Sequence, residues 1–149
     1  MLDIASINNL ASLETLFRTL KGTLMLTIIG SVLAGLIGAG IFFIGASYFW
    51  APQVASGFGI PRVPVADPSF QSWILVKGVR DIASGLFIAV LLANGSAHLL
   101  GWFILTAAVI PVGDALVVLH SKGPKAAAYG IHAATALVMV VISVLLLAG

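Results

Sequence analysis

The chain has 149 residues, of which 60% are hydrophobic and 8% are charged, and its mean hydropathy is +1.17. A soluble domain typically has about 25% charged residues, so this composition excludes an ordinary soluble fold. The formal net charge of +2 argues against a nucleic-acid partner. The sequence contains no cysteine, which excludes disulfides, thiolate metal sites and Cys-x-x-Cys redox chemistry.

The N-terminal segment, residues 1–22, has an amphipathic pattern. Leu10, Leu13, Phe17 and Leu20 recur on one helical face, while hydroxyl side chains and Arg18 occupy the other. This pattern predicts a short helix lying at a membrane surface and leading into the first span. A partly disordered tail is the alternative.

Four apolar segments follow, and each is long enough to cross a hydrocarbon core, which takes about 20 residues. We expect spans at about residues 24–50, 73–92, 99–119 and 127–147, so that residues 23–149 form one four-span transmembrane domain. In the first span, Gly30, Ala34 and Gly38 have the four-residue spacing that lets helices approach closely in lipid. The predicted fold class is therefore all-α: an integral membrane four-helix bundle with a short amphipathic N-terminal helix.

Prolines divide the rest of the pattern. The connection at residues 51–72 cannot be a continuous helix because it contains Pro52, Pro61, Pro64 and Pro68. This connection is either a lid over the end of the bundle or a linker at the membrane interface. Pro111 interrupts the third span, since it has no amide hydrogen for the Ala107 carbonyl.

The second span carries the most informative residues, because Lys77, Arg80 and Asp81 lie within five positions. A charged side chain at the bilayer centre costs about 2.5–3.5 kcal/mol by insertion scales, so such residues normally face other helices and are paired. At 1.5 Å per residue, these charges lie about 6–12 Å inward from Trp73. We therefore expect this span to form one wall of a polar site.

Polar residues of two other spans reach the same depth. The third span ends, and the fourth begins, on the side of the long connection, which puts Asp114 and His132 each about 8 Å inward. Ser84 continues the polar face of the second span, and Thr135 continues that of the fourth. The sequence thus predicts one polar level, beneath the 51–72 connection.

This level has two interpretations. In the structural one, Arg80 pairs with Asp114 and Lys77 pairs with Asp81, and the ion pairs only join helices. In the functional one, the groups line a pocket for a small lipophilic molecule and perform acid–base catalysis. The catalytic candidates are then Asp81, Asp114 and His132, and the substrate-binding candidates are Arg80, Lys77, Ser84 and Thr135.

Within the functional interpretation, Arg80 is the expected clamp for an oxygen of the ligand, because its guanidinium does not deprotonate. An isomerisation or cyclisation fits better than a redox reaction, since the sequence has neither cysteine nor a cofactor motif. We expect no metal, because the three histidines lie on separate segments and the cationic side chains would repel a metal ion. The alternatives are a small proton-coupled transporter, acting as a homodimer, and a structural or accessory membrane subunit.

Three sequence pieces carry a resemblance to a known family. They are Lys77-Gly78-Val79-Arg80-Asp81, Ile110-Pro111-Val112-Gly113-Asp114 and His132-Ala133-Ala134-Thr135. Together with Phe58-Gly59-Ile60-Pro61, they resemble the domain of unknown function 4267 family over about residues 28–147. The resemblance implies a compact four-helix integral membrane protein of bacteria and fungi and supplies no reaction. We accordingly expect a multi-pass protein of a bacterial inner membrane, with the lipid bilayer as its main partner.

Overall fold

The computed structural model describes residues 4–149, with side-chain environments described from residue 12 onward. The fold is all-α and 85% helical, as the sequence predicts. Its elements are α1 (Ile4–Ser47), η1 (Pro52–Phe58), α2 (Pro68–Asn94), α3 (Ala97–Ala107), α4 (Val109–His120), α5 (Lys125–Ala127), η2 (Ala128–Ala133) and α6 (Ala134–Ala148). Three stretches are helical, long and apolar enough to cross a membrane: Ser12–Ser47, Ala97–His120 and Lys125–Ala148.

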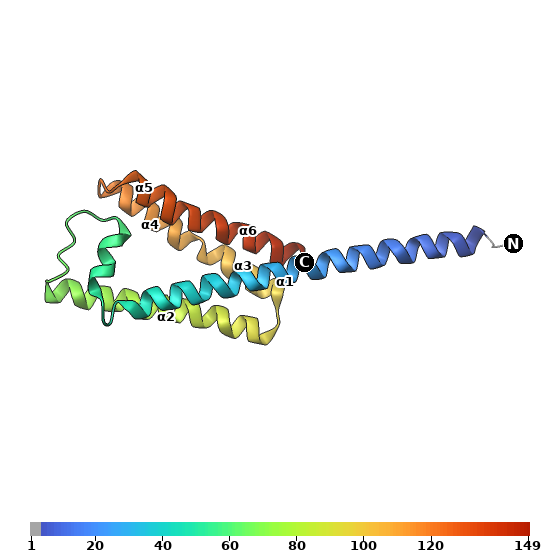
Figure 1. The fold of residues 1–149 in the computed structure, drawn as a ribbon, viewed down its shortest axis with the longest axis horizontal. Coiled ribbons are helices and arrows are strands. Elements are labelled where there is room, and N and C mark those ends of the chain that lie inside the picture. The colour runs from blue at the N-terminus through green and yellow to red at the C-terminus, as the bar shows by residue number, and fades with distance from the viewer. Residues whose placement is uncertain (1–3) are drawn as a thin grey trace.

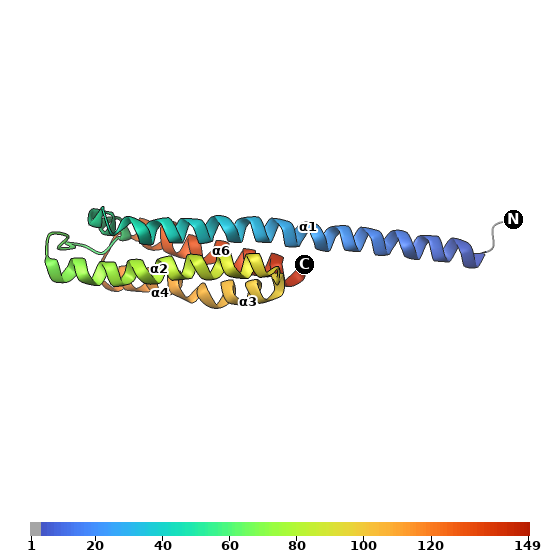
Figure 2. The same ribbon diagram turned by 90° about the horizontal axis from the view of Figure 1, so that it is seen from below.

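Helix α1 is one continuous helix of 44 residues. Its N-terminal half projects beyond the other helices in both views (Figures 1 and 2), and the side chains from Ser12 to Lys21 are exposed. The backbone has no break at residue 22, so the segment expected to be a separate short helix is the first part of α1. Residues 1–3, and the side chains of residues 4–11, including Leu10 of the expected apolar face, lie outside the described part.

Helices α1 and α2 lie side by side and antiparallel (Figure 2), and glycines set their separation. A Cβ added to Gly45 would lie 2.6 Å from the Gly78 carbonyl oxygen, and one added to Gly85 would lie 2.6 Å from the Gly38 carbonyl oxygen. Backbones this close leave no room for side chains. Gly30 makes a similar close approach to Leu146 of α6, so the predicted small-residue row does mark helix contacts.

Local signals explain where α2 begins and ends. The Asp67 carboxylate accepts a hydrogen bond of 2.7 Å from the Phe70 amide, and Pro68 occupies the first helical position. This cap starts α2 before Trp73, where the span was expected to begin. At the other end, Gly95 has φ +77°, which favours glycine, and Ser96 then caps α3.

The third expected span is divided at Ala108 into α3 and α4. The division lies three residues before Pro111, whose missing amide hydrogen interrupts the helical hydrogen bonding, in agreement with the sequence-based prediction. Pro111 is buried. The bend therefore belongs to the inner face of this segment.

Helices α1, α2, α3 and α6 share a common core at one end of the molecule. A buried core there contains Ala34, Ile88, Leu100, Ile104, Ala108, Met139, Ile142 and Leu146, and the buried Ser143 hydroxyl donates a hydrogen bond of 2.9 Å to the Gly101 carbonyl. Toward the other end, the α1–α2 pair diverges from α4, α5 and η2 (Figure 1). The molecule therefore has the form of a fork with two arms.

The segment after α1 joins the two arms. Its η1 turn lies between them (Figure 1), and a Cβ added to Gly59, which has φ +100°, would lie 2.7 Å from the Ala127 side chain. Gly123, in the α4–α5 turn, comes so close to the Gly59 carbonyl that it has no space for a side chain. This segment therefore covers the open end of the fork.

Candidate functional site

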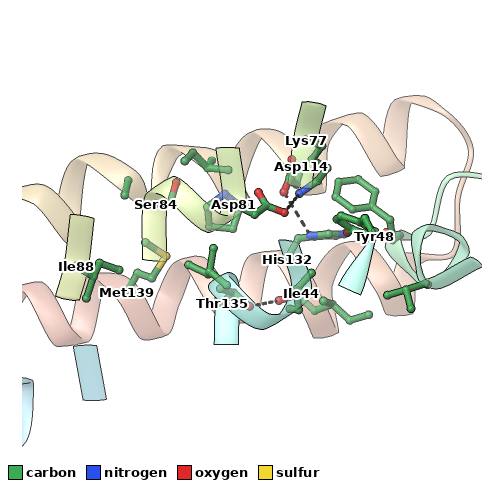
Figure 3. Close-up of a pocket in the computed structure, with 18 residues that line it drawn as sticks. Ile44, Tyr48, Lys77, Asp81, Ser84, Ile88, Asp114, His132, Thr135 and Met139 are labelled. Atoms are coloured by element: carbon green, nitrogen blue, oxygen red, sulfur yellow. Dashed lines mark hydrogen bonds and ion pairs between the residues drawn. The ribbon is translucent and has the colours of Figure 1, made fainter. Parts of the chain in front are cut away.

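A cavity of about 340 Å³ lies between the two arms of the fork (Figure 3). Its apolar lining consists of Ile41, Ile44, Val54, Gly57, Phe58, Ile88, Ala107, Ile110, Pro111, Ile131 and Met139. Its polar lining consists of Tyr48, Lys77, Asp81, Ser84, Asp114, His132 and Thr135. The cavity therefore receives all of the predicted site residues except Arg80.

Lys77 and Asp81 form an ion pair on α2. The Lys77 Nζ lies 2.6 Å from the Asp81 Oδ2, as expected for residues four apart on one helix. The same Nζ lies 5.8 Å from the ring centroid of Tyr48 and 5.6 Å from that of Phe58. Both distances lie within the range of cation–π attraction, so the ammonium group interacts with both aromatic rings.

His132 has one fixed hydrogen bond. Its Nε2 lies 2.8 Å from the main-chain carbonyl oxygen of Phe58. Because a carbonyl oxygen can only accept, the hydrogen must be on Nε2. In the neutral imidazole, Nδ1 then carries a lone pair.

Asp114 faces this second nitrogen. Its Oδ2 lies 3.9 Å from the Nδ1 of His132, which is too long for a hydrogen bond. A carboxylate and a neutral Nδ1 are both acceptors, so Asp114 and His132 form a pair of proton acceptors at one wall of the cavity. The part of the chain that the structure describes contains no group of three His, Asp or Glu side chains able to hold a metal ion.

The backbone around His132 is a π-helix over Ala128–Ala133. The Ala134 amide reaches the Tyr129 carbonyl, five residues back, and the Thr135 hydroxyl donates a hydrogen bond of 2.7 Å to the Ile131 carbonyl. Such one-turn π segments are rare and occur often at functional sites. Here it changes the direction of the His132 side chain relative to a regular α-helix.

The hydroxyls of Ser84 and Thr135 are both occupied. Ser84 donates a hydrogen bond of 2.9 Å to the Arg80 carbonyl, four residues earlier, just as Thr135 donates to Ile131. Their hydrogens therefore point to helix backbone, and their oxygens are left as acceptors. Neither residue is positioned to donate a hydrogen bond to a ligand.

Arg80 lies outside the cavity. Its side chain is exposed, as are those of Val76, Val79 and Phe87 on α2. Among the described residues, the guanidinium has no hydrogen-bond or ion-pair partner, so the expected Arg80–Asp114 pair is not formed. The face of α2 toward the cavity consists of Lys77, Asp81, Ser84 and Ile88, and Arg80 falls beside it.

Tyr48 is the polar cavity residue that the sequence analysis did not select. Its side chain is 4% exposed and lines the cavity, and its hydroxyl has no hydrogen-bond partner among the described residues. Its spacing from Ile41 and Ile44 places it on the inner face of α1. That spacing was the signal by which the sequence could have placed it in the site.

The two ends of the cavity differ in polarity. Tyr48, Lys77, Asp114 and His132 gather at the end near η1, whereas Ile88 and Met139 lie toward the core (Figure 3). A small molecule bound here would meet ionisable groups with one end and hydrocarbon with the other.

The family profile described as "Domain of unknown function (DUF4267)" matches residues 38–146. The chain belongs to the DUF4267 family. The resemblance seen in the sequence is thus confirmed. The DUF4267 region begins at Gly38 and contains both arms of the fork and every residue that lines the cavity. No curated protein matches the chain, and no solved structure matches it.

Proposed function

We propose that this protein is a multi-pass integral membrane protein of a bacterial inner membrane, with four helical segments crossing the bilayer. Three of them are the long apolar stretches of α1, α3–α4 and α5–α6. The fourth is α2, which lies side by side with α1 (Figure 2), and whose Lys77 and Asp81 face the cavity as an ion pair. Buried and paired charges are the arrangement that a bilayer tolerates.

We further propose that the cavity binds a small lipophilic molecule and catalyses an acid–base isomerisation or cyclisation. The observation that carries this proposal is the combination of a mostly apolar cavity of about 340 Å³ with ionisable groups at one end. This volume is within the range of about 300–1,000 Å³ typical of small-molecule sites. The exposed lining residues Ile44, Val54, Ile110 and Ile131 are apolar, so a lipid-soluble molecule can enter past them.

In this proposal, Asp114 and His132 transfer the proton. They come from α4 and η2, and the Asp114 Oδ2 lies 3.9 Å from the His132 Nδ1. At this distance both groups can contact the same part of a bound molecule and pass a proton to and from it. Asp81 is neutralised by Lys77 and serves to hold that ammonium group in place. Arg80 takes no part, because its side chain lies outside the cavity.

Native mass spectrometry of the purified protein tests the proposal. We expect a lipophilic molecule to copurify with the wild type and to be lost from Gly57→Leu, since Gly57 lines the cavity and has open space beside it. The matched control is Gly40→Leu, at an exposed glycine that also has open space but is not in the cavity. Equal occupancy in the wild type and Gly57→Leu would contradict a ligand in this cavity.

Two carboxylate variants separate catalysis from the other functions. We expect Asp114→Asn and Asp81→Asn to accumulate as folded protein. Asp114→Asn should retain only the unreacted molecule, whereas the wild type should contain a mixture of substrate and product. If both variants instead unfold in detergent, the charges serve structure alone. Uptake driven by a proton gradient in liposomes, abolished by Asp114→Asn, would identify a transporter.

A further inference from the structure

Tyr48 places a hydrogen-bond donor at the same end of the cavity as Asp114 and His132 (Figure 3). Its hydroxyl has no hydrogen-bond partner within the described part of the chain, and the residue is 4% exposed and lines the cavity. The Lys77 ammonium lies 5.8 Å from the Tyr48 ring centroid and adds positive charge at this end. The polar end of the cavity thus holds a hydroxyl donor together with the acceptors Asp114 and His132.

His132 and Asp114 together provide the groups needed to remove a proton from a ligand. The Phe58 carbonyl holds the hydrogen of His132 on Nε2, which leaves Nδ1 free to accept. The neighbouring Asp114 oxygen, 3.9 Å from Nδ1, stabilises the imidazolium that would form.

We infer that the ligand is a lipophilic carbonyl compound and that the Tyr48 hydroxyl donates a hydrogen bond to its oxygen. This inference rests on the proposed function. The carbonyl oxygen of the ligand accepts a hydrogen bond from the Tyr48 hydroxyl, while the carbon next to the carbonyl faces Asp114 and His132. The hydrocarbon part extends toward Ile88 and Met139, at the apolar end (Figure 3). No other polar side chain of the cavity offers a free neutral donor, because Ser84 and Thr135 donate to helix backbone.

The reaction is an enolisation. Nδ1 of His132 takes the proton from the carbon next to the carbonyl, the C–H electron pair becomes a C=C bond, and the C=O π pair moves to oxygen. The Tyr48 hydroxyl stabilises the resulting enolate. For a β,γ-unsaturated carbonyl compound the enolate is conjugated with the second C=C bond. Return of the proton from His132 to the γ carbon then restores the carbonyl and moves that C=C bond next to it, so the isomerisation needs no further reactant.

The test uses three probes with one carbon skeleton: trans-2-decalone, trans-2-decalol and trans-decalin. Each is titrated into the purified full chain, and the infrared C=O stretch of the bound ketone is recorded. We expect the ketone to bind about tenfold more tightly than decalin, the factor that corresponds to one hydrogen bond of about 1.4 kcal/mol. In Tyr48→Phe this ratio should fall to about one, and the C=O stretch should move to higher frequency.

A second readout follows the chemistry. In D₂O the wild type should catalyse deuterium incorporation next to the decalone carbonyl, detected by mass spectrometry. Loss of one donor to a developing oxyanion typically reduces a rate by about 10²–10³-fold, and we expect this loss in Tyr48→Phe. The matched control is Tyr129→Phe, because Tyr129 is the only other tyrosine, is 57% exposed and is not in the cavity.

The outcomes separate this inference from the proposed function. Equal binding of all three probes, or a C=O stretch unchanged by Tyr48→Phe, would overturn the role of Tyr48 while leaving a lipophilic cavity in place. Failure of every probe to bind, together with no copurifying molecule, would overturn both. A structural role of Tyr48 would change neither the C=O frequency nor the deuterium exchange selectively, since phenylalanine retains the ring.

Discussion

The Nε2–H of His132 donates a hydrogen bond of 2.8 Å to the carbonyl of Phe58, which lies 74 positions earlier in the chain. The two rings are also in contact, with centroids 4.5 Å apart. This contact joins η1, which follows the α1 arm, to η2 in the other arm. The cover of the cavity and the orientation of its histidine are therefore determined by the same bond.

Replacing this histidine should loosen the cover. In His132→Leu the half-buried Phe58 carbonyl loses its partner, which costs about 1–3 kcal/mol. We expect amide hydrogen exchange in residues 52–58 to become about tenfold faster or more, with little change in α3. His98→Leu, at an exposed histidine far from the cavity, is the control. Unchanged exchange in residues 52–58 would show that Gly59 and Gly123 hold the segment without this bond.

The close approach of α1 and α2 should be sensitive to a single methyl group. Gly85→Ala places a Cβ 2.6 Å from the Gly38 carbonyl oxygen, and overpacking of this kind costs about 1–3 kcal/mol. Gly40→Ala, with nothing within 4 Å, should be neutral or slightly stabilising, because alanine is the better helix former. Thermal unfolding in detergent measures both, and equal melting temperatures would contradict the close contact.

The Lys77–Asp81 pair should behave as a coupled unit, whereas Arg80 should not. The Lys77 and Asp81 side chains are 32% and 17% exposed, so breaking the pair leaves a partly buried charge without a partner. A double-mutant cycle with Lys77→Gln and Asp81→Asn should give a coupling energy of about 0.5–3 kcal/mol. Arg80→Gln should change stability by less than about 0.5 kcal/mol, as is usual for exposed residues. A larger effect of Arg80→Gln than of Lys77→Gln would contradict the described orientations.

Pro111 should account for the bend between α3 and α4. In Pro111→Ala an amide hydrogen becomes available for the Ala107 carbonyl, so we expect the two helices to become continuous across Ala108. Slower amide exchange at residues 107–112 would report this change. Since Pro111 and Ala107 both line the cavity, ligand occupancy should fall as well. Pro64→Ala, in the connection before α2, is a control that should change neither the amide exchange at residues 107–112 nor the ligand occupancy.

Much of the arrangement was predictable from one-dimensional rules. The depth argument, which uses only the rise per residue, correctly brought Lys77, Asp81, Asp114 and His132 together, since all four line the cavity. The glycine spacing in α1 correctly marked a helix contact. Both depend on regular helix geometry, which holds along most of the chain.

The failures have physical causes. Arg80 lies one position before Asp81 and therefore about 100° around the helix, so small differences in helix rotation decide whether it faces inward. The π-helix around His132 leaves no trace in the hydrophobic pattern, because it lasts only one turn. The path of residues 52–59 depends on contacts with Val118, Gly123 and Ala127, which are far away in sequence.

The glycine contacts between α1 and α2 also determine the register of the site. Gly45 touches Gly78, and Gly38 touches Gly85, so the two contacts are seven residues apart on both helices. With two such contacts in place, one helix cannot slide along the other without forcing a larger residue into a space that fits only hydrogen. Tyr48 follows Gly45 by three residues and Lys77 directly precedes Gly78, so their relative height is fixed by residues that carry no side chain.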